Sequence, residues 1–199
     1  VIYDQGLFVI EVKAASFTYT SPTTDFKAYM DSIKTLILKP TLQARRLIRR
    51  LEADGEVKLF DGPTLENQLG TLRQADFTQI VPCSVTLDNL MHLAAQAENL
   101  KVLGADFDGF PVWAMPVDDM RVYADLFRSP TQFLHFVRQR MKAVTSKSLT
   151  VTDELDHLGM FLDHNDYAKY AENFHETHQS DVPIWVGYSK RIDEYYSQL

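Results

Sequence analysis

The sequence predicts an α/β fold in which a mixed central sheet is flanked by helices, followed by a mostly helical C-terminal extension. Along residues 1–144, short apolar runs of strand length alternate with segments whose apolar residues recur at helical spacing. Hydrophobic residues make up 45% of the 199 residues and charged residues 24%, so the chain can build a core. A polar segment, 145–152, then marks the best internal boundary. The sequence therefore predicts a domain at 1–144 and an extension at 145–199.

The first half of the chain is predicted to begin with two strands and to continue with two helices. Gly6 is expected to supply the positive φ in the turn between the strands, and Lys39-Pro40 is expected to interrupt the helical region. The expected elements are strands Val1–Tyr3 and Leu7–Lys13, helices from Asp25 to Ile37 and from Pro40 to Asp54-Gly55, a strand Val57–Phe60, an irregular segment 61–76, and a strand Phe77–Val85.

The second half is predicted to be mainly helical. Thr86 is a candidate N-cap for a helix that uses Leu87, Leu90, Met91, Ala94 and Ala97. Asp118 and Ser129 are candidate caps for two further helices, the second with a capping box completed by Gln132. The other expected elements are a strand at 110–117, helices around 154–162 and 167–174, a strand at 182–188 and a terminal helix at 190–199.

Two opposite charges stand at the end of the apolar run Leu7–Ile10. Glu11 and Lys13 are two positions apart, so on a strand they point to one face while Val12 points to the other. A carboxylate is a hard oxygen ligand suited to Mg²⁺, and an ammonium beside it can hold water or offset phosphate charge. The alternative is a solvated ion pair at the end of a strand, which contributes under about 1 kcal/mol to stability.

The stretches "GLFVIEVKAASFTYTSP" and "KPTLQARRLIRRL" resemble the restriction-endonuclease-like PD-(D/E)XK nuclease superfamily, nearest its nuclease-related members. More loosely, "FPVWAMPVDDMRVYADLFRSPTQFLHFVRQRM" and "DELDHLGMFLDHNDY" are similar to downstream segments of that group. The resemblance implies metal-dependent hydrolysis of DNA. It implies Glu11 as a ligand of Mg²⁺ or Mn²⁺, Lys13 as the group that assists the attacking water, and Gln43 as a helical side chain pointing back to the site. A solvated helical Gln43 is the alternative.

The same family carries a first metal-binding Asp on the preceding strand, about a dozen residues before the Glu. That position falls just before Val1, and we expect an upstream segment to supply this Asp. Asp4 is the second choice for a metal ligand, although a carboxylate at such a position is more often a turn residue.

The net charge of −7 argues against broad, non-specific binding to nucleic acid, but the charges are unevenly distributed. The predicted second helix carries four arginines that we place on the side away from its apolar stripe, where they either contact DNA phosphates or form a solvated cationic face. These arginines are Arg45, Arg46, Arg49 and Arg50.

Three functions remain open from the sequence: a metal-dependent DNA nuclease, a non-catalytic DNA- or protein-binding module with the nuclease fold, and a scaffold whose C-terminal region binds a protein partner. No apolar run is long enough to cross a bilayer, and no signal peptide is visible. The single cysteine, Cys83, suits a reducing compartment, so we expect a cytoplasmic protein without membrane contact. A histidine metal site at His175 and His178, with His164 and Asp166, is a weaker candidate. The oligomeric state is left open.

Overall fold

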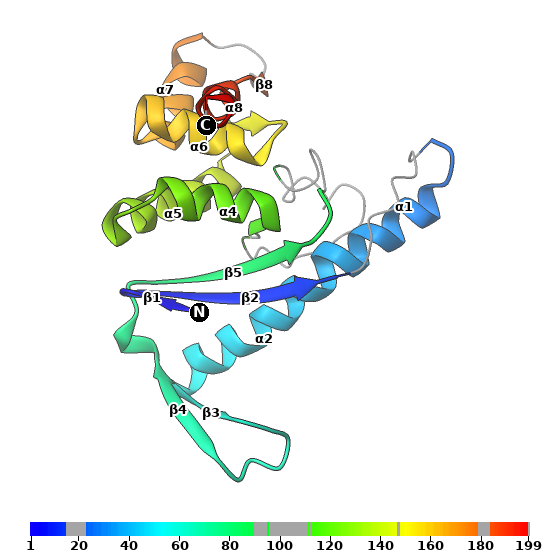
Figure 1. Cartoon of the computed structure of the whole chain (residues 1–199), viewed down its shortest axis with the longest axis vertical. Helices are drawn as coiled ribbons and strands as arrows, with labels where there is room; N and C mark the ends of the chain where they lie inside the picture. Colours follow the sequence, from blue (N-terminus) through cyan, green and yellow to red (C-terminus); the bar gives the residue numbers. More distant parts are fainter. Residues whose placement is uncertain are drawn as a thin grey trace.

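A mixed sheet with helices on both faces forms the centre of the molecule (Figure 1). The computed structural model describes residues 1–14, 23–89, 95, 111, 113–146, 148–178 and 184–198. The strand order is β1-β2-β5-β6, with β1 antiparallel to β2 and the other neighbours parallel. The strands are β1 (Ile2–Tyr3), β2 (Gly6–Lys13), β5 (Gln79–Thr86) and β6 (Trp113–Pro116). The predicted mixed α/β sheet is confirmed.

One face of this sheet is covered by α2 (Lys39–Asp54), and α1 (Phe26–Ile33) lies in line with α2 as one rod that extends past the end of β2 in Figure 1. A π-helical turn, Lys34–Leu38, joins the two helices. The side chain of Asp25 caps α1 by accepting the amide hydrogen of Ala28, and α2 ends at Gly55 in the left-handed conformation. Apolar side chains of α2 pack on alternate residues of β2 and on the hairpin that follows; this cluster comprises Leu7, Val9, Ala44, Ile48, Leu51 and Leu72.

Pro40 does not interrupt the helical rod, contrary to the sequence prediction. Proline lacks the amide hydrogen that would bond the carbonyl four residues earlier, which here belongs to Leu36. The hydroxyl of Ser84, on β5, donates to that carbonyl oxygen at 2.7 Å, and the local π-helical turn absorbs the change in geometry. The sheet therefore satisfies the group that the proline leaves without its helical partner.

Replacing Ser84 by Ala is expected to lower the free energy of unfolding by about 1–3 kcal/mol, because the buried carbonyl of Leu36 would lose this donor. Urea unfolding followed by circular dichroism measures the change. The variant Ser197→Ala, at an exposed position of the C-terminal helix, is the control and should change stability by less than about 0.5 kcal/mol. An equally small effect of Ser84→Ala would show that this hydrogen bond does not hold the helix to the sheet.

The opposite face of the sheet is covered by α4 (Val117–Leu126) and α5 (Pro130–Thr145). Above them in Figure 1 lie α6 (Glu154–His164), α7 (Tyr167–His178) and α8 (Lys190–Ser197), with the short pair β7 (Thr150–Val151) and β8 (Ile184–Trp185). One hydrophobic cluster extends from Phe8 on β2 to Ile192 on α8. Buried contacts thus run across residues 144 and 145, and the division of the chain there stays a prediction.

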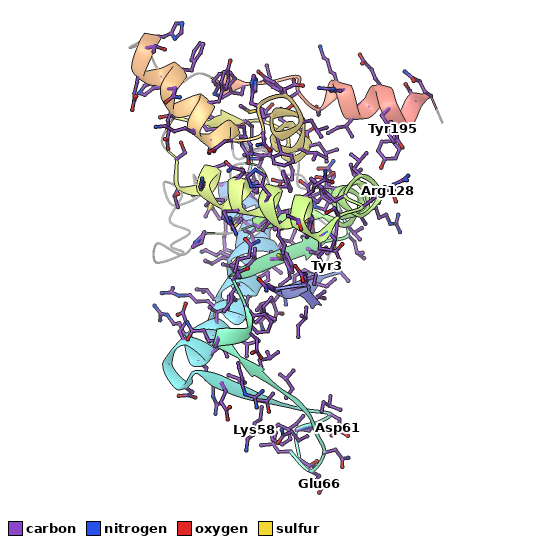
Figure 2. The ribbon with its side chains drawn as sticks, turned by 90° about the vertical axis from the view of Figure 1, so that its left-hand side faces the viewer. Tyr3, Lys58, Asp61, Glu66, Arg128 and Tyr195 are labelled. Atoms are coloured by element: carbon purple, nitrogen blue, oxygen red, sulfur yellow. The ribbon has the colours of Figure 1, made fainter. Side chains whose placement is uncertain are left out.

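The segment 61–76 is not mostly irregular as predicted, because β4 (Gln68–Arg73) pairs with β3 (Glu56–Phe60) in an antiparallel hairpin. A short 3₁₀ turn, Gln74–Asp76, follows β4. The hairpin projects from the end of α2 away from the helical layers (Figure 1), and Lys58, Asp61 and Glu66 lie along it in Figure 2. The polar residues of β4 interrupt the alternation of apolar and polar residues that predicts a strand, and β4 forms through its pairing with β3.

Three turn and cap predictions are corrected by the structure. The positive φ in the β1–β2 turn belongs to Asp4, at 51°, and not to Gly6. A Cβ on Gly6 would lie 2.7 Å from Leu134 Cδ2, so glycine there lets β2 pack closely against α5. Asp118 lies inside α4, which begins after Pro116, and Ser129 caps α5 without a side-chain hydrogen bond. Most of the helix expected after Thr86 lies outside the described residues.

Candidate functional site

The side chains of β2 alternate between the two faces of the sheet. Leu7 and Val9 pack against α2, whereas Phe8 and Ile10 belong to the cluster on the opposite face. The same period of two places Glu11 and Lys13 on the α2 face and leaves Val12 on the other face, where it is 60% exposed. Both charged side chains are partly buried, and they share a face as the spacing predicted.

Lys13 contacts the helix that covers this face. Its Nζ donates a hydrogen bond to Oε1 of Gln43, on α2, at 3.0 Å. Thirty residues of sequence separate these two side chains, and the crossover from β2 through α2 to β5 brings them together. The hydrogen bond fixes the ammonium at the C-terminal end of β2, beside the exposed surface of α2.

Glu11 lies directly opposite Ser84 in the parallel ladder between β2 and β5. Ser84 is buried and its hydroxyl is engaged with the carbonyl of Leu36, whereas the side chain of Glu11 is only partly buried. Within the part of the chain that the structure describes, no group of three or more His, Cys, Asp or Glu side chains is arranged to hold a metal ion. Mg²⁺ binds through one or two carboxylates with water and phosphate oxygens, so Glu11 is a candidate protein ligand for it.

Asp4 does not join this site. It lies in the turn between β1 and β2, at the end of β2 opposite to Glu11. At roughly 3.3 Å per residue, the strand from Gly6 to Glu11 alone spans about 16 Å, far beyond the reach of two carboxylates sharing one ion. The second-choice assignment of Asp4 as a metal ligand is therefore wrong, and the residue serves the turn.

A cationic stripe runs along the exposed side of α2 from the position of Gln43. Counted from Lys39, Gln43 is at i+4, Arg46 at i+7 and Arg50 at i+11, so the four residues line one side of the helix. These four residues are all exposed and are called the α2 stripe below. Arg50 forms an ion pair with Asp54 at 3.3 Å.

The predicted set of four exposed arginines needs one correction. Arg45 is only 7% exposed and belongs to the buried side of α2 with Thr41, Ala44 and Ile48. The buried side of this helix is wider than the apolar stripe alone suggested, because α2 is covered on both flanks of Ala44. Arg46, Arg49 and Arg50 are exposed, as expected.

A buried ion pair that sequence reasoning missed lies on the opposite face of the sheet. Arg140 and Glu154 are 0% and 1% exposed, and Arg140 donates from Nε to Oε1 at 3.0 Å and from Nη2 to Oε2 at 2.9 Å. Oε1 also accepts from Trp113 Nε1 at 2.7 Å and from Tyr123 Oη at 3.0 Å. Burial and the carboxylate raise the pKa of Tyr123 well above its usual value. This fully enclosed network holds β6, α4, α5 and α6 together.

The sequence carried a weak signal for this pair. Arg140 follows Phe136 and Val137 at helical spacing and so falls on the buried side of α5, where a charge requires a partner. Glu154 opens a helix whose first turn is buried, but nothing in the sequence pairs the two residues.

The carboxyl group of Asp119, in the first turn of α4, has a raised pKa, and the buried carboxylate of Glu154 is one of the causes. Burial, followed by Glu154, Asp153 and Asp118, raises the pKa of its carboxyl group to about 8. The unfolded chain ionises this group near pH 4, whereas the folded protein keeps its proton until about pH 8. The folded state therefore loses stability as the pH rises from about 4 to about 8.

The variant Asp119→Asn cannot ionise and is expected to escape this loss. Its melting temperature should match that of the wild type near pH 4 and exceed it by a difference that grows up to pH 8–9. Thermal unfolding followed by circular dichroism at pH 4, 6 and 8.5 measures the difference. The control is Asp76→Asn, at an exposed position, whose melting temperature should differ from that of the wild type by the same amount at every pH. A difference that does not change with pH for Asp119→Asn would contradict the raised pKa of Asp119.

The histidines of the C-terminal region pack against aromatic rings. His164 stacks on Tyr170 with ring centroids 3.8 Å apart, and His178 stacks on Phe174 at 4.0 Å. Burial, followed by the charge of Arg140, lowers the pKa of His157 well below its usual value. Among the described residues these imidazoles form no metal-binding group.

Comparisons with protein-family models, with curated proteins and with solved structures find no match for this chain. In the part of the chain that the structure describes, none of the helices combines the length and the apolar character that crossing a membrane requires.

Proposed function

We propose that this chain is a metal-dependent nuclease domain that hydrolyses DNA phosphodiester bonds at the C-terminal end of β2. The observation that carries the proposal is the hydrogen bond from Lys13 Nζ to Gln43 Oε1, on the same face as Glu11. The carboxylate of Glu11 and the ammonium of Lys13 thus share the face that packs against α2, and the α2 stripe, to which Gln43 belongs, offers cations to a phosphate backbone.

Each side chain has a role that follows from its chemistry. Glu11 would hold Mg²⁺ or Mn²⁺, with water and phosphate oxygens as the other ligands. A bound divalent ion supplies Lewis-acid stabilisation of the phosphate and a more acidic water. Lys13 places positive charge where negative charge develops on the phosphate, and Gln43 fixes the direction of that ammonium. Lys39, Arg46 and Arg50 would contact phosphates along the strand.

The pairing register of β1 and β2 indicates which position on a longer β1 would lie opposite Glu11. Ile2 lies opposite Leu7 and Tyr3 opposite Gly6, so each step back along β1 is a step forward along β2. If β1 extends upstream of Val1, the third residue of the extension would lie opposite Glu11 and on the same face. An Asp at that point would supply the second ligand that the resemblance implies.

The second candidate function is a non-catalytic DNA- or protein-binding module with the same fold. The observation that favours it is that the described residues contain no group of three or more His, Cys, Asp or Glu arranged to hold a metal ion, together with the net charge of −7. Such a module would keep the α2 stripe for phosphate contact without hydrolysis.

A plasmid-cleavage assay separates the two functions. Supercoiled DNA is incubated with Mg²⁺ or Mn²⁺ and with the wild type, Glu11→Gln, or the control Glu52→Gln, an exposed residue on α2. We expect nicking by the wild type and the control, and a rate lower by about 100-fold or more for Glu11→Gln, because losing a metal ligand costs several kcal/mol of transition-state stabilisation. Equal cleavage by Glu11→Gln would remove Glu11 from the mechanism. DNA binding without cleavage by the wild type would favour the binding module.

A further inference from the structure

A cavity of about 370 Å³ lies on the face of the sheet opposite to Glu11 and Lys13. The sheet forms its floor, and α4 and α5 form its roof. Its walls are mainly aromatic and aliphatic and include Phe8, Ile10, Trp113, Tyr123, Phe127 and Phe133. Among the described residues that line it, none has a charged side chain.

The polar atoms of Trp113 and Tyr123, two of the aromatic residues that line the cavity, are bound outside it. Trp113 Nε1 and Tyr123 Oη both donate to Oε1 of Glu154, which lies in the buried network and does not line the cavity. Their rings therefore present carbon to the cavity. Cys83 also lines it, and burial raises the pKa of its thiol, so this sulfur stays neutral. An uncharged, apolar molecule is the only kind that loses no hydrogen bonds on entering such a space.

The cavity opens at β1. Val1 and Tyr3 line it and are 72% and 37% exposed, so its mouth lies beside the sheet edge where Figure 2 labels Tyr3. Ring contacts centred on Phe133 line the edges of the cavity. The ring centroids of Tyr3, Phe8 and Phe127 lie 5.8, 5.5 and 5.6 Å from the ring centroid of Phe133. The walls are thus formed by rings that pack on one another, which keeps the space from collapsing.

We propose that this cavity binds a single hydrocarbon chain of medium length, such as the tail of an alcohol or acyl compound, with its polar end at the mouth beside Tyr3. Ligand cavities range from about 300 to 1,000 Å³, so this one suits one slender chain better than a large cofactor. Cavities with apolar walls take up apolar molecules, and the walls of this one are almost entirely apolar. The inference is independent of the proposed nuclease activity, because the cavity and the Glu11 site lie on opposite faces of the sheet.

The test uses the uncharged fluorophore N-phenyl-1-naphthylamine and its displacement by straight-chain alcohols from hexanol to dodecanol. We expect the probe to bind, and each further CH₂ of the alcohol to tighten binding by about fourfold until the cavity is full. Ala124→Phe, which adds a ring at the wall, should weaken probe binding by at least about tenfold. The matched control Ala53→Phe, at an exposed position on α2, should leave it unchanged.

A second variant keeps the test decisive if Ala124→Phe fails to fold. Met120→Ala enlarges the same cavity and should move the end of the chain-length series to longer alcohols. Three results would overturn the proposal: no displacement by any alcohol, equal probe binding by Ala124→Phe in its folded state, or no shift for Met120→Ala. A wild type that self-associates in light scattering, alongside a monomeric Ala124→Phe, would also overturn it by showing that a second copy covers this face.

Discussion

Glu154→Gln is expected to lower the free energy of unfolding by about 3–5 kcal/mol. The substitution keeps the shape of the side chain and an acceptor for Trp113 and Tyr123, but it leaves the charge of Arg140 without its counter-charge. Arg140 is 0% exposed, so water cannot replace the carboxylate without opening the core between α5 and α6. Urea unfolding followed by circular dichroism and Trp fluorescence measures the change.

Two comparisons make this result specific. The control Glu172→Gln removes an exposed partner of Lys169 on α7 and should change stability by less than about 0.5 kcal/mol. The double variant Arg140→Met with Glu154→Leu removes both charges and should be more stable than Glu154→Gln. A loss below about 1 kcal/mol for Glu154→Gln would show that this network does not hold β6, α4, α5 and α6 together.

Lys13→Met is expected to lower the rate of metal-dependent DNA cleavage by about 100-fold while leaving the fold intact. The Met side chain covers the same strand end but removes the positive charge that Gln43 directs toward the site. Plasmid nicking under single-turnover conditions measures the rate. Lys58→Met, on the projecting hairpin, is the control and should cleave as the wild type does. A cleavage rate for Lys13→Met within about twofold of the wild type would contradict the proposed role.

Gln43 is a positioning residue in this account, because it acts through Lys13. Gln43→Ala should lower cleavage by about tenfold, which is the effect typical of a side chain that orients a functional group. Adding Gln43→Ala to Lys13→Met should cause no further loss, since the group that Gln43 positions is already absent. Multiplicative losses in the double variant would mean that the two side chains act separately.

Much of the candidate site could be predicted from local periodicity. The period of two places Glu11 and Lys13 on one face, and the helical stripe of α2 shows which side of the helix meets the sheet. The placement of Gln43 came from the resemblance and not from spacing, and its contact with Lys13 spans 30 residues of sequence. The error at Arg45 has a physical origin: an arginine can be buried on a helix flank when other parts of the chain cover it, which helical spacing does not reveal.

The features that sequence reasoning missed depend on partners far along the chain. Pro40 should break a helix, but the hydroxyl of Ser84, 48 residues away from Leu36, supplies the missing donor. The strand β4 contains Gln, Gly and Arg and becomes a strand only through its pairing with β3. The partner of Arg140 is Glu154, which follows the polar segment 145–152, so no local feature of the sequence indicates that a buried ion pair joins the two sides of this segment.

Paramagnetic broadening by Mn²⁺ will show whether a divalent ion binds at Glu11 on the α2 face of the sheet. In ¹H–¹⁵N spectra of the ¹⁵N-labelled protein, low Mn²⁺ concentrations should first broaden the amide signals of Glu11, Lys13 and Ser84, and then that of Gln43. Excess Mg²⁺ and the variant Glu11→Gln should each abolish this effect. Broadening that begins instead at the acidic residues of α6 to α8, or that is unchanged in Glu11→Gln, would contradict the account.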